Sequence, residues 1–362
     1  MGKGEKIQQG DGAGGELMQK MLSRSVLPHI RRGSGRPSKV GIPPGLLDDS
    51  STIGDMVFTI DGHTVSPLFF PGGDIGSLSV FGTVNDLAVS GGVPEVLALS
   101  MVMEEGLEIE KLEAISRSIG AAAQRSNIEI VTGDTKVVEK GGVDGMIVTT
   151  AGLGRRHPEL DGCLDKASES LSGRIGQRRS YNWLRDDAPE PGDVIILTGS
   201  VGDHGISLLS LREGYGFDSD LISDLAPLNG LMSEAIRSGG VVASKDLTRG
   251  GLANALNEWA TKTSLEISVD QDEIPVKESV RSACEMLGLD PYEIGNEGKA
   301  IIAVDPDYAE DLLRILKMNE IGSESRIIGS FSAGRGRVIL KTEVGGKRIM
   351  DPPYGDPIPR IC

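Results

Sequence analysis

Short apolar runs alternate with amphipathic stretches along most of the chain. Four runs in the first half have the length and composition of β-strands. They occupy residues 56–60, 95–103, 128–134 and 145–152. A helix with one apolar face is predicted between them by apolar residues at spacings of three and four, namely Ile109, Leu112, Ile115 and Ile119. The pattern predicts an α/β domain over residues 46–154.

A second series of strand-like runs follows in the other half of the chain. These runs occupy residues 193–199, 265–269, 300–305 and 337–342, and an amphipathic segment lies at 250–262. The series predicts a second domain of α+β type over residues 190–345. A length of 362 residues also favours two domains over one. The predicted fold class is therefore α/β (α+β) with two domains.

Three segments do not follow this alternation. Residues 1–45 form a glycine-rich N-terminal segment, and residues 155–189 are polar, rich in Arg and weakly periodic, which predicts an insertion or a mobile linker. Residues 346–362 are predicted to form a mobile tail. Its last twelve residues, DPPYGDPIPRIC, hold four prolines and favour an extended conformation with a reach of roughly 30 Å. This tail places Cys362 at the tip of an arm.

Composition narrows the possible partners and the compartment. A formal charge of −16 argues against nucleic acid or an anionic membrane surface as the main partner. No run approaches the ~20 apolar residues of a membrane-spanning helix, and the first residues lack the apolar stretch of a signal peptide. The three cysteines have neither metal-binding spacing nor the even number of a disulfide framework. We therefore expect a cytoplasmic protein in a reducing compartment.

Acidic side chains gather beside glycines and at predicted strand ends. The candidates are Asp48, Asp49, Asp61, Asp86, Asp134 and Asp246, with Asn85 adjacent to one of them. Carboxylate oxygens at such junctions suit Mg²⁺, which takes a few carboxylates together with substrate phosphates. Lys136 lies on the same side of an extended segment as Asp134 and could neutralise phosphate oxygens. Any one of these acids could instead be a helix cap or a turn former, so the prediction depends on the set.

A nucleotide would have to bind without the common phosphate loops. The chain contains neither a GxxxxGK[ST] loop nor a GxGxxG turn that leads from a strand into a helix. The stretch DGAGG, residues 11–15, is the best candidate for a glycine-rich cover over phosphates. The alternative is a flexible terminus without a ligand.

Several longer motifs resemble the HypE family, the carbamoyl-cysteine dehydratases of nickel-iron hydrogenase maturation. This family belongs to the superfamily of aminoimidazole ribonucleotide (AIR) synthetase and selenophosphate synthetase. The motifs run in order from Asp11 to Cys362 and read FPGGDIG, GTVNDLAVSGG, EEG, VTGDTKVVEKGG, GDHG, DLTRGGLANALNE, LGLDP, NEGK and PRIC. The chain departs from the family pattern at Asp11, where His is usual, at Ile60, where Thr is common, and in its longer middle segment.

The resemblance implies an AIR-synthetase-like fold and a reaction on the chain's own tail. The N-terminal sheet would form the core of a homodimer, with ATP in a cleft near the interface. A partner carbamoyltransferase would load Cys362, and the enzyme would use ATP to dehydrate the S-carboxamide to a thiocyanate. An iron-bearing scaffold complex would then accept the cyanide.

The resemblance also assigns roles to single residues. It implies Mg²⁺ ligands among Asp49, Asp86, Asp134 and Asp246, with Asp48 as a substitute for Asp49. It implies ATP contacts from Asp11, Gly14, Gly15, Asp61, Asn85, Asp134, Thr135 and Lys136. The catalytic set is Cys362, Lys136 and a base, either Glu297 or His204. Apart from the family, His204 could be a turn residue and Glu297 a structural cap.

Two other functions remain open from the residues. The chain could be a sibling synthetase that acts on a free small molecule, in which case Cys362 would be idle. It could also be a carrier that displays a modified cysteine without turning over ATP. The α-carboxylate of Cys362 disfavours its thiolate, and Arg360 is expected to offset only part of this effect.

Overall fold

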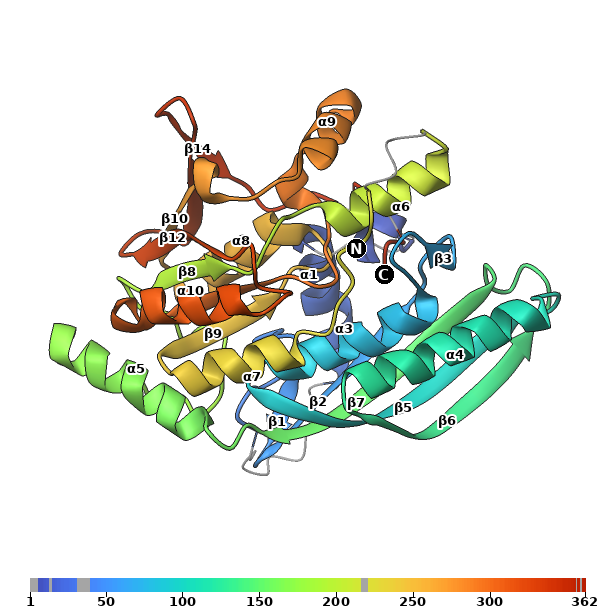
Figure 1. The fold of residues 1–362 in the computed structure, drawn as a ribbon, viewed down its shortest axis with the longest axis horizontal. Helices are drawn as coiled ribbons and strands as arrows, with labels where there is room; N and C mark the ends of the chain where they lie inside the picture. The colour runs from blue at the N-terminus through green and yellow to red at the C-terminus, as the bar shows by residue number, and fades with distance from the viewer. Residues whose placement is uncertain (1–5, 13–14, 31–39, 216–220, 356, 359) are drawn as a thin grey trace.

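The structure is a computed structural model, and it describes residues 6–12, 15–30, 40–215, 221–355, 357–358 and 360–362 (Figure 1). Two sheets, each covered by helices, form its main body. Within the described residues, no helix has the length and apolar character needed to cross a membrane. The α/β (α+β) class predicted from the alternation of apolar runs is confirmed.

The first sheet has five strands in the order β1-β2-β7-β5-β6. Their bounds are β1 Ser51–Ile53, β2 Met56–His63, β5 Gly92–Glu104, β6 Glu129–Val138 and β7 Met146–Arg156. All neighbours are antiparallel except β5 and β6. Helices α3 (Ile75–Val89) and α4 (Ile109–Arg125) pack on one face of this sheet, as Figure 1 shows. The predicted helix is present, and Ile115 and Ile119 of α4 are buried against α3. Ile109, which was predicted on the same apolar face, is 67% exposed.

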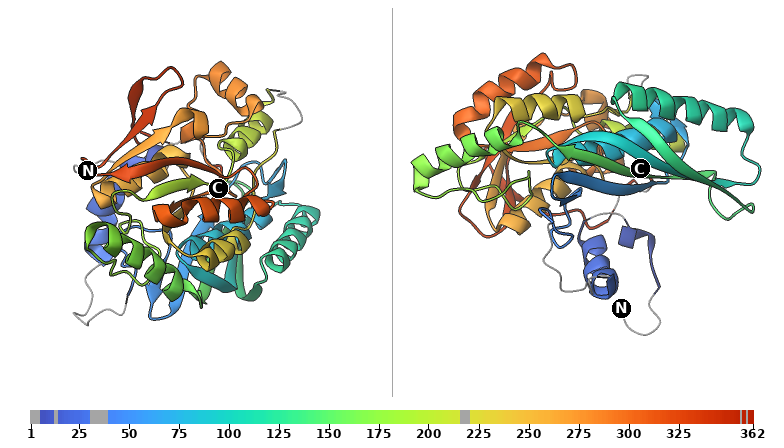
Figure 2. Two further views of the ribbon diagram at one scale, coloured as in Figure 1. Left: turned by 60° about the vertical axis from the view of Figure 1, so that its left-hand side comes forward. Right: turned by 90° about the horizontal axis from the view of Figure 1, so that it is seen from below.

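The opposite face of the first sheet carries exposed apolar side chains. Phe58 of β2 lies across from Leu153 of β7, and both are more than one-third exposed. Ile60, two residues further along β2, is 69% exposed. In the right-hand view of Figure 2 the N-terminal helices lie on the side of the sheet away from α4. Apolar patches of this kind mark interaction surfaces.

The second sheet has seven strands in the order β14-β13-β10-β12-β8-β11-β9. Their bounds are β8 Val194–Leu197, β9 Val241–Asp246, β10 Glu266–Asp270, β11 Ala300–Val304, β12 Arg326–Ser332, β13 Arg337–Lys341 and β14 Lys347–Met350. Helix α8 (Gly251–Thr263) packs on one face, where Trp259 contacts Phe331. The other face is covered by α5 (Leu160–Ile175), α7 (Asn229–Ser238) and α10 (Ala309–Met318).

The remaining elements are short. They are η1 Gln9–Gly12, α1 Gly15–Met21, η2 Leu22–Val26, α2 Leu27–Ile30, β3 Phe69–Phe70, β4 Gly73–Asp74, α6 Asp203–Glu213, η3 Gln271–Glu273, α9 Glu278–Leu287, η4 Pro291–Glu293 and η5 Pro306–Tyr308. Of these, α1 contributes Met18 and Gln19 to the lining of the cavity that also contains Cys362.

The middle segment, residues 155–189, was predicted to lie outside the core, and this prediction is wrong. Its helix α5 buries Leu160, Cys163 and Leu164 in the same core as α7 and β9. Trp183, further along, is fully buried. The apolar face of α5 includes small residues such as Ala and Cys among polar neighbours, so its periodicity is weak in the sequence. The segment connects the two sheets through a packed core.

The C-terminal tail is docked in the structure. The predicted boundary at residue 346 is also displaced, because Lys347–Met350 form β14, which pairs with β13. Ile358 and Ile361 are each 1% exposed, and they anchor the tail in a core shared with the first domain. The backbone N–H of Thr64 donates to a terminal carboxylate oxygen of Cys362, and that of Ser66 donates to the carbonyl of Arg360. The two isoleucines and these hydrogen bonds hold the extended segment in place, contrary to the predicted mobile arm.

Candidate active site

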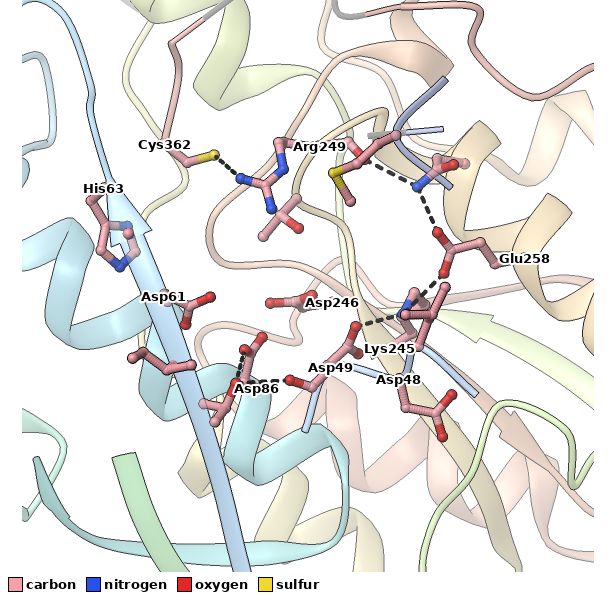
Figure 3. A pocket seen from close by; sticks show the side chains of 18 of the residues that line it. Asp48, Asp49, Asp61, His63, Asp86, Lys245, Asp246, Arg249, Glu258 and Cys362 are labelled. Carbon is pink, nitrogen blue, oxygen red and sulfur yellow. Dashed lines mark hydrogen bonds and ion pairs between the residues drawn. The ribbon is translucent and has the colours of Figure 1, made fainter. Parts of the chain in front are cut away.

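A cavity of about 270 Å³ lies between β2 and α3 of the first domain and β9 and α8 of the second (Figure 3). The tip of the tail closes one end of it. Its polar lining residues are Gln19, Asp48, Asp49, Thr59, Asp61, His63, Asp86, Lys245, Asp246, Thr248, Arg249, Asn254, Glu258, Glu297 and Cys362. Acidic groups outnumber cations in this lining. The cavity therefore suits a divalent cation, which can in turn bind the phosphates of a nucleotide.

Three acids from distant parts of the sequence meet in this cavity. Asp49 precedes β1, Asp86 lies on α3 and Asp246 ends β9. One carboxylate oxygen from each lies within 4.8 Å of the others. Burial raises the pKa of Asp86 and Asp246 well above the ordinary value, and repulsion adds to this, first from Asp61 at Asp86 and from Asp49 at Asp246. Burial also raises the pKa of Asp49 to about 6, although Lys245 opposes the shift. Asp246 also has a buried Oδ2 that finds no hydrogen-bond partner within the described part of the chain. Such a set of oxygens fits Mg²⁺, which would remove the repulsion.

A buried ion network fixes one side of this acid cluster. The Nζ of Lys245 donates to Oδ1 of Asp49 and lies 3.3 Å from Oδ2 of Asp186. Asp186 also accepts from Lys262 and from the indole N–H of Trp259 at 2.7 Å. Burial alone would raise the pKa of Asp186, but Lys245 and Lys262 together hold it well below its usual range. Asp186 therefore stays ionised and holds the lysine that orients Asp49.

Two further predicted acids line the same cavity. Asp61 on β2 accepts a hydrogen bond from Thr83 of α3 at 3.0 Å. Asp48 pairs with Lys262 at 3.1 Å, and its pKa is raised to about 7, mainly by burial and then by Asp186. Asp48 lies outside the cluster of three carboxylates, so Asp49 is the better-placed ligand of the two.

A tight turn between β9 and α8 carries Arg249 to the tail. Gly250 and Gly251 both have positive φ angles, of 77° and 56°. A Cβ on Gly251 would lie 2.4 Å from the carbonyl oxygen of Ile294, so another residue could not take its place without a backbone shift. The turn points Arg249 back toward the chain terminus.

Arg249 contacts the thiol of Cys362. Its Nη1 lies 3.6 Å from Sγ, as the dashed line in Figure 3 marks. The negative charge at Cys362 raises the pKa of Arg249, and Asp61 and Glu297 add to this. Arg360, which was expected to offset part of the effect of the α-carboxylate, donates instead to Asp144 and to the carbonyl of Thr64. Arg249 is therefore the guanidinium that faces the thiol.

The two candidate bases occupy different positions. Glu297 lines the cavity, and its Oε1 is buried with no hydrogen-bond partner among the described residues. Burial, followed by repulsion from Asp246, raises the pKa of Glu297 well above the ordinary value. His204 does not line the cavity. Its Nε2 lies 2.8 Å from the carbonyl oxygen of Ile361 and its Nδ1 lies 2.7 Å from the Ser223 hydroxyl. These contacts occupy both ring nitrogens of His204, which therefore holds the tail, and Glu297 is left as the candidate base.

Several predicted ATP contacts lie outside the cavity. The amide of Asn85 donates to the carbonyls of Ala226 and Glu297 and accepts from the N–H of Leu228, so it joins the two domains. Asp11 accepts from the N–H of Gln8 in a separate surface hollow. Gly15 packs against the carbonyl of Pro353 in the tail. The remaining predicted contact, Gly14, lies outside the described residues.

The residues of β6 that were predicted to bind phosphate also lie apart from the cavity. Asp134 and Lys136 form an ion pair at 3.2 Å, with both side chains about two-thirds exposed. Thr135 between them is exposed as well. Within one subunit, these three residues do not join Asp49, Asp86 and Asp246.

The residues of this site that reasoning from the sequence missed include His63, Asp186, Lys245 and Arg249. Lys245 and Arg249 flank Asp246 in the motif KDLTRGG, so the motif itself carried the signal. Asp186 lay in the segment that was thought to be a linker. His63 follows Asp61 on β2 with no distinguishing pattern around it.

Comparisons with known proteins agree with this geometry. Residues 47–156 match the AIR synthase related protein N-terminal domain, and residues 190–341 match the corresponding C-terminal domain. A carbamoyl dehydratase HypE from Rhizobium leguminosarum bv. viciae is 39% identical over 363 residues, covering 99% of this chain and 95% of that protein.

Solved structures point the same way. The hydrogenase maturation protein HypE in complex with ATP has a TM-score of 0.77 at 35% identity and covers 99% of this chain and 100% of that one. A chain of a HypE-HypF complex has a TM-score of 0.78 at 36% identity, covering 91% and 100%. The chain therefore belongs to the HypE family of carbamoyl dehydratases.

Proposed function

We propose that the chain uses ATP to dehydrate a carbamoyl group carried on its own Cys362, giving a thiocyanate that provides the cyanide ligand of a hydrogenase iron. The observation that carries this proposal is the position of the Cys362 side chain, which lines the same cavity as Asp49, Asp86 and Asp246. A thiol at the chain terminus, docked beside a cluster of carboxylates, fits a substrate that is part of the enzyme.

The reaction balances as two steps. First, the carbonyl oxygen of the S-carboxamide bonds to the γ-phosphorus of ATP, the bond to ADP breaks, and one N–H proton leaves. The C–O bond then breaks, phosphate leaves, and loss of the second N–H proton completes the C≡N bond. Phosphorylation turns a poor leaving group into a good one, so catalysis consists mainly of positioning and neutralisation of charge.

We assign Asp49, Asp86 and Asp246 as ligands of Mg²⁺. Their clustered oxygens and the unpartnered Oδ2 of Asp246 support the assignment. When bound, the metal would neutralise charge on the ATP phosphates. Lys245 keeps Asp49 oriented toward the other two acids through its own contact with Asp186.

The residues near the thiol divide the remaining work. Arg249 holds the sulfur and can donate to the oxygen of the carbamoyl group that sulfur carries. Glu297 has a raised pKa, and a carboxylate of this kind is a stronger base once ionised, so it is suited to take a proton from the amide nitrogen. His204 fixes the backbone of the tail.

We infer a homodimer formed through the open face of the first sheet. The exposed side chains of Phe58, Ile60 and Leu153 support this contact. Lys136 and Asp134 lie at the free edge of the same sheet and are not near the cavity of their own subunit. We therefore assign any phosphate contact by Lys136 to the partner's site across this interface.

Two further partners are proposed. A carbamoyltransferase would load Cys362, and the structure of a HypE-HypF complex in the same family supports a partner of this kind. An iron-bearing scaffold complex would accept the cyanide. For either protein to reach the sulfur, the tail would have to leave the cavity.

Phosphate release with and without carbamoylation tests the function against its alternatives. The dehydratase should release phosphate from ATP only when Cys362 carries the carbamoyl group, and Cys362→Ala should abolish this release. A free-substrate synthetase would retain its activity in Cys362→Ala, and a carrier would release no phosphate in any state.

A further inference from the structure

His63, at the end of β2, is a buried polar side chain whose position the reaction above does not explain. It is 4% exposed, and both of its ring nitrogens are buried without a hydrogen-bond partner among the described residues. An unsatisfied buried polar group is costly, so a ring with two such atoms points to a ligand that is yet to bind.

The ring is held close to the terminal residue. His63 lines the cavity together with Cys362. The next residue, Thr64, donates its backbone N–H to a terminal carboxylate oxygen of Cys362 at 3.1 Å. On the other side, the ring packs on α3, where a Cβ built on Gly82 would lie 3.0 Å from its Cε1. The end of β2 thus holds His63 and the backbone of Cys362 in fixed positions relative to each other.

Arg249 and His63 belong to different walls around the thiol. Arg249 comes from the turn before α8, while His63 comes from β2, and Figure 3 shows the two side chains on different sides of Cys362. A carbamoyl group on Sγ extends into the space that these walls enclose. It carries two N–H donors and one carbonyl acceptor.

A neutral imidazole suits such a group. Burial, with a smaller contribution from Arg249, lowers the pKa of His63 to about 4, while Asp61 opposes the shift. The ring is therefore neutral at physiological pH and presents one N–H donor and one bare nitrogen acceptor. Its unmet acceptor and the unmet donors of an amide nitrogen are complementary.

We propose that His63 binds the substrate amide by accepting a hydrogen bond from the NH₂ of the carbamoyl group on Cys362, which orients the carbonyl oxygen for phosphorylation. The proposal rests on the proposed function and adds a substrate-binding residue to it. It also explains why the ring nitrogen that acts as acceptor has no partner among the described residues while Cys362 is unmodified.

Single-turnover dehydration of the loaded protein tests this role. The carbamoyltransferase first carbamoylates Cys362, Mg·ATP is then added, and intact mass spectrometry follows loss of water. His63→Phe keeps a ring but removes both nitrogens, and should slow dehydration by roughly 10- to 100-fold, as loss of one buried hydrogen bond implies. His63→Gln, which keeps a donor and an acceptor, should recover most of the rate.

Two more variants test whether the effect depends on the position of the His63 ring and whether it is specific to this histidine. Gly82→Ala leaves His63 intact but crowds its ring, and should also slow dehydration. His157→Gln removes another buried histidine, which contacts Ser233 away from the cavity, and should leave the rate unchanged. Carbamoylation of Cys362 itself should proceed in all four variants. Dehydration of loaded His63→Phe at the wild-type rate would overturn the proposal.

A spectroscopic measurement avoids any folding defect of the variants. The chain has four histidines, so ¹⁵N labelling of the imidazoles gives few signals. Carbamoylation of Cys362 should shift a ring nitrogen of His63, and unchanged His63 signals would contradict the proposal. If wild-type protein is loaded but never loses water with Mg·ATP, the proposed function fails instead.

Discussion

The Nη1 of Arg249 lies 3.6 Å from the Sγ of Cys362, although the two residues are 113 positions apart in the chain. This contact joins the turn before α8 to the last residue of the protein. It gives the reacting sulfur a guanidinium on one side, while Lys245 serves the acid cluster at the other end of the cavity. The two ends of the cavity thus have separate cations and separate tasks.

Replacement of Arg249 should therefore impair chemistry at the sulfur. We expect Arg249→Gln to slow dehydration of the loaded tail by roughly 10- to 100-fold, because a charge-assisted hydrogen bond is lost. Arg249→Lys should recover only part of the rate, since a lysine cannot present the planar fork of donors. Single-turnover mass spectrometry measures both variants, and a wild-type rate in Arg249→Gln would exclude this role.

The cluster of Asp49, Asp86 and Asp246 should lower the stability of the free protein, although it is proposed to bind Mg·ATP. The pKa of Asp246 is higher in the folded protein than in the unfolded chain. The contribution of Asp246 to the free energy of unfolding therefore falls as the pH rises above the pKa that Asp246 has in the unfolded chain. Asp246→Asn should therefore stabilise the free protein at pH 8, by about 0.5–2 kcal/mol, and the gain should shrink toward pH 5. The same variant should lose the stabilisation that Mg·ATP gives to wild type.

Thermal unfolding with and without Mg·ATP checks this prediction. Glu113→Gln is a suitable control, because Glu113 forms only an exposed pair with Arg117 on α4. If Asp246→Asn still responds to Mg·ATP as wild type does, Asp246 is not a ligand.

Docking of the tail should weaken as pH falls. His204 faces the carbonyl of Ile361, the hydroxyl of Ser223 and the ring of Phe70, and burial lowers its pKa to about 4. An undocked tail exposes His204 and restores a pKa near 6.5, so protons favour the undocked state between about pH 6.5 and 4. His63 acts in the same direction. Docking is full above this range.

Carboxypeptidase digestion of the tail measures the effect. Between pH 7.5 and 5.5, the undocked fraction should rise by roughly tenfold for one histidine with this shift. His204→Gln should show a weaker pH dependence, because its side chain does not titrate. Equal pH dependence in the two proteins would refute the assignment of His204 to the tail.

The open face of the first sheet should determine the oligomeric state. We expect Phe58→Glu to give a monomer in light scattering, because a charge would be buried against the partner's apolar strands. Ile109→Glu is the matched control, since Ile109 is 67% exposed on α4, on the other side of the sheet. A dimer that survives Phe58→Glu would place the interface elsewhere.

The dimer also allows a test of Lys136 across the interface. Protein with Lys136→Ala and protein with Asp246→Asn should each be inactive, yet mixing the two should restore part of the activity. Restoration requires that one active site draws these residues from different subunits.

Periodicity in the sequence predicted the parts of the fold where one element packs on a uniform surface. The spacing of Ile115 and Ile119 located α4. The apolar runs located β2, β5, β6 and β7 of the first sheet and β8, β10, β11 and β13 of the second, but they missed the fully buried strand β9. Helix α5 was missed because its buried face includes Cys163 and Ala167, which add little to an apolar pattern. Local pattern is weakest where small residues pack closely.

The site divides in a similar way. Asp49, Asp86 and Asp246 were recognisable from motifs, and the structure brings them together. The docked tail was not predictable from its prolines, because docking depends on Ile358 and Ile361 meeting a core built from distant segments. Asp134 and Lys136 lie in a motif as clear as the others, but their position depends on β6 being at the edge of a sheet. The predictions for the site failed where the position of a residue depends on contacts between distant parts of the chain, and not because the residue type was unsuitable.

The most direct test of the account is intact mass spectrometry of the protein after carbamoylation by its carbamoyltransferase, before and after addition of Mg·ATP. We predict that the Cys362 peptide gains one carbamoyl group and then loses the mass of one water only when ATP is present. A carbamoylated Cys362 that keeps its mass with Mg·ATP, or a competent partner that leaves Cys362 unmodified, would contradict the central claim.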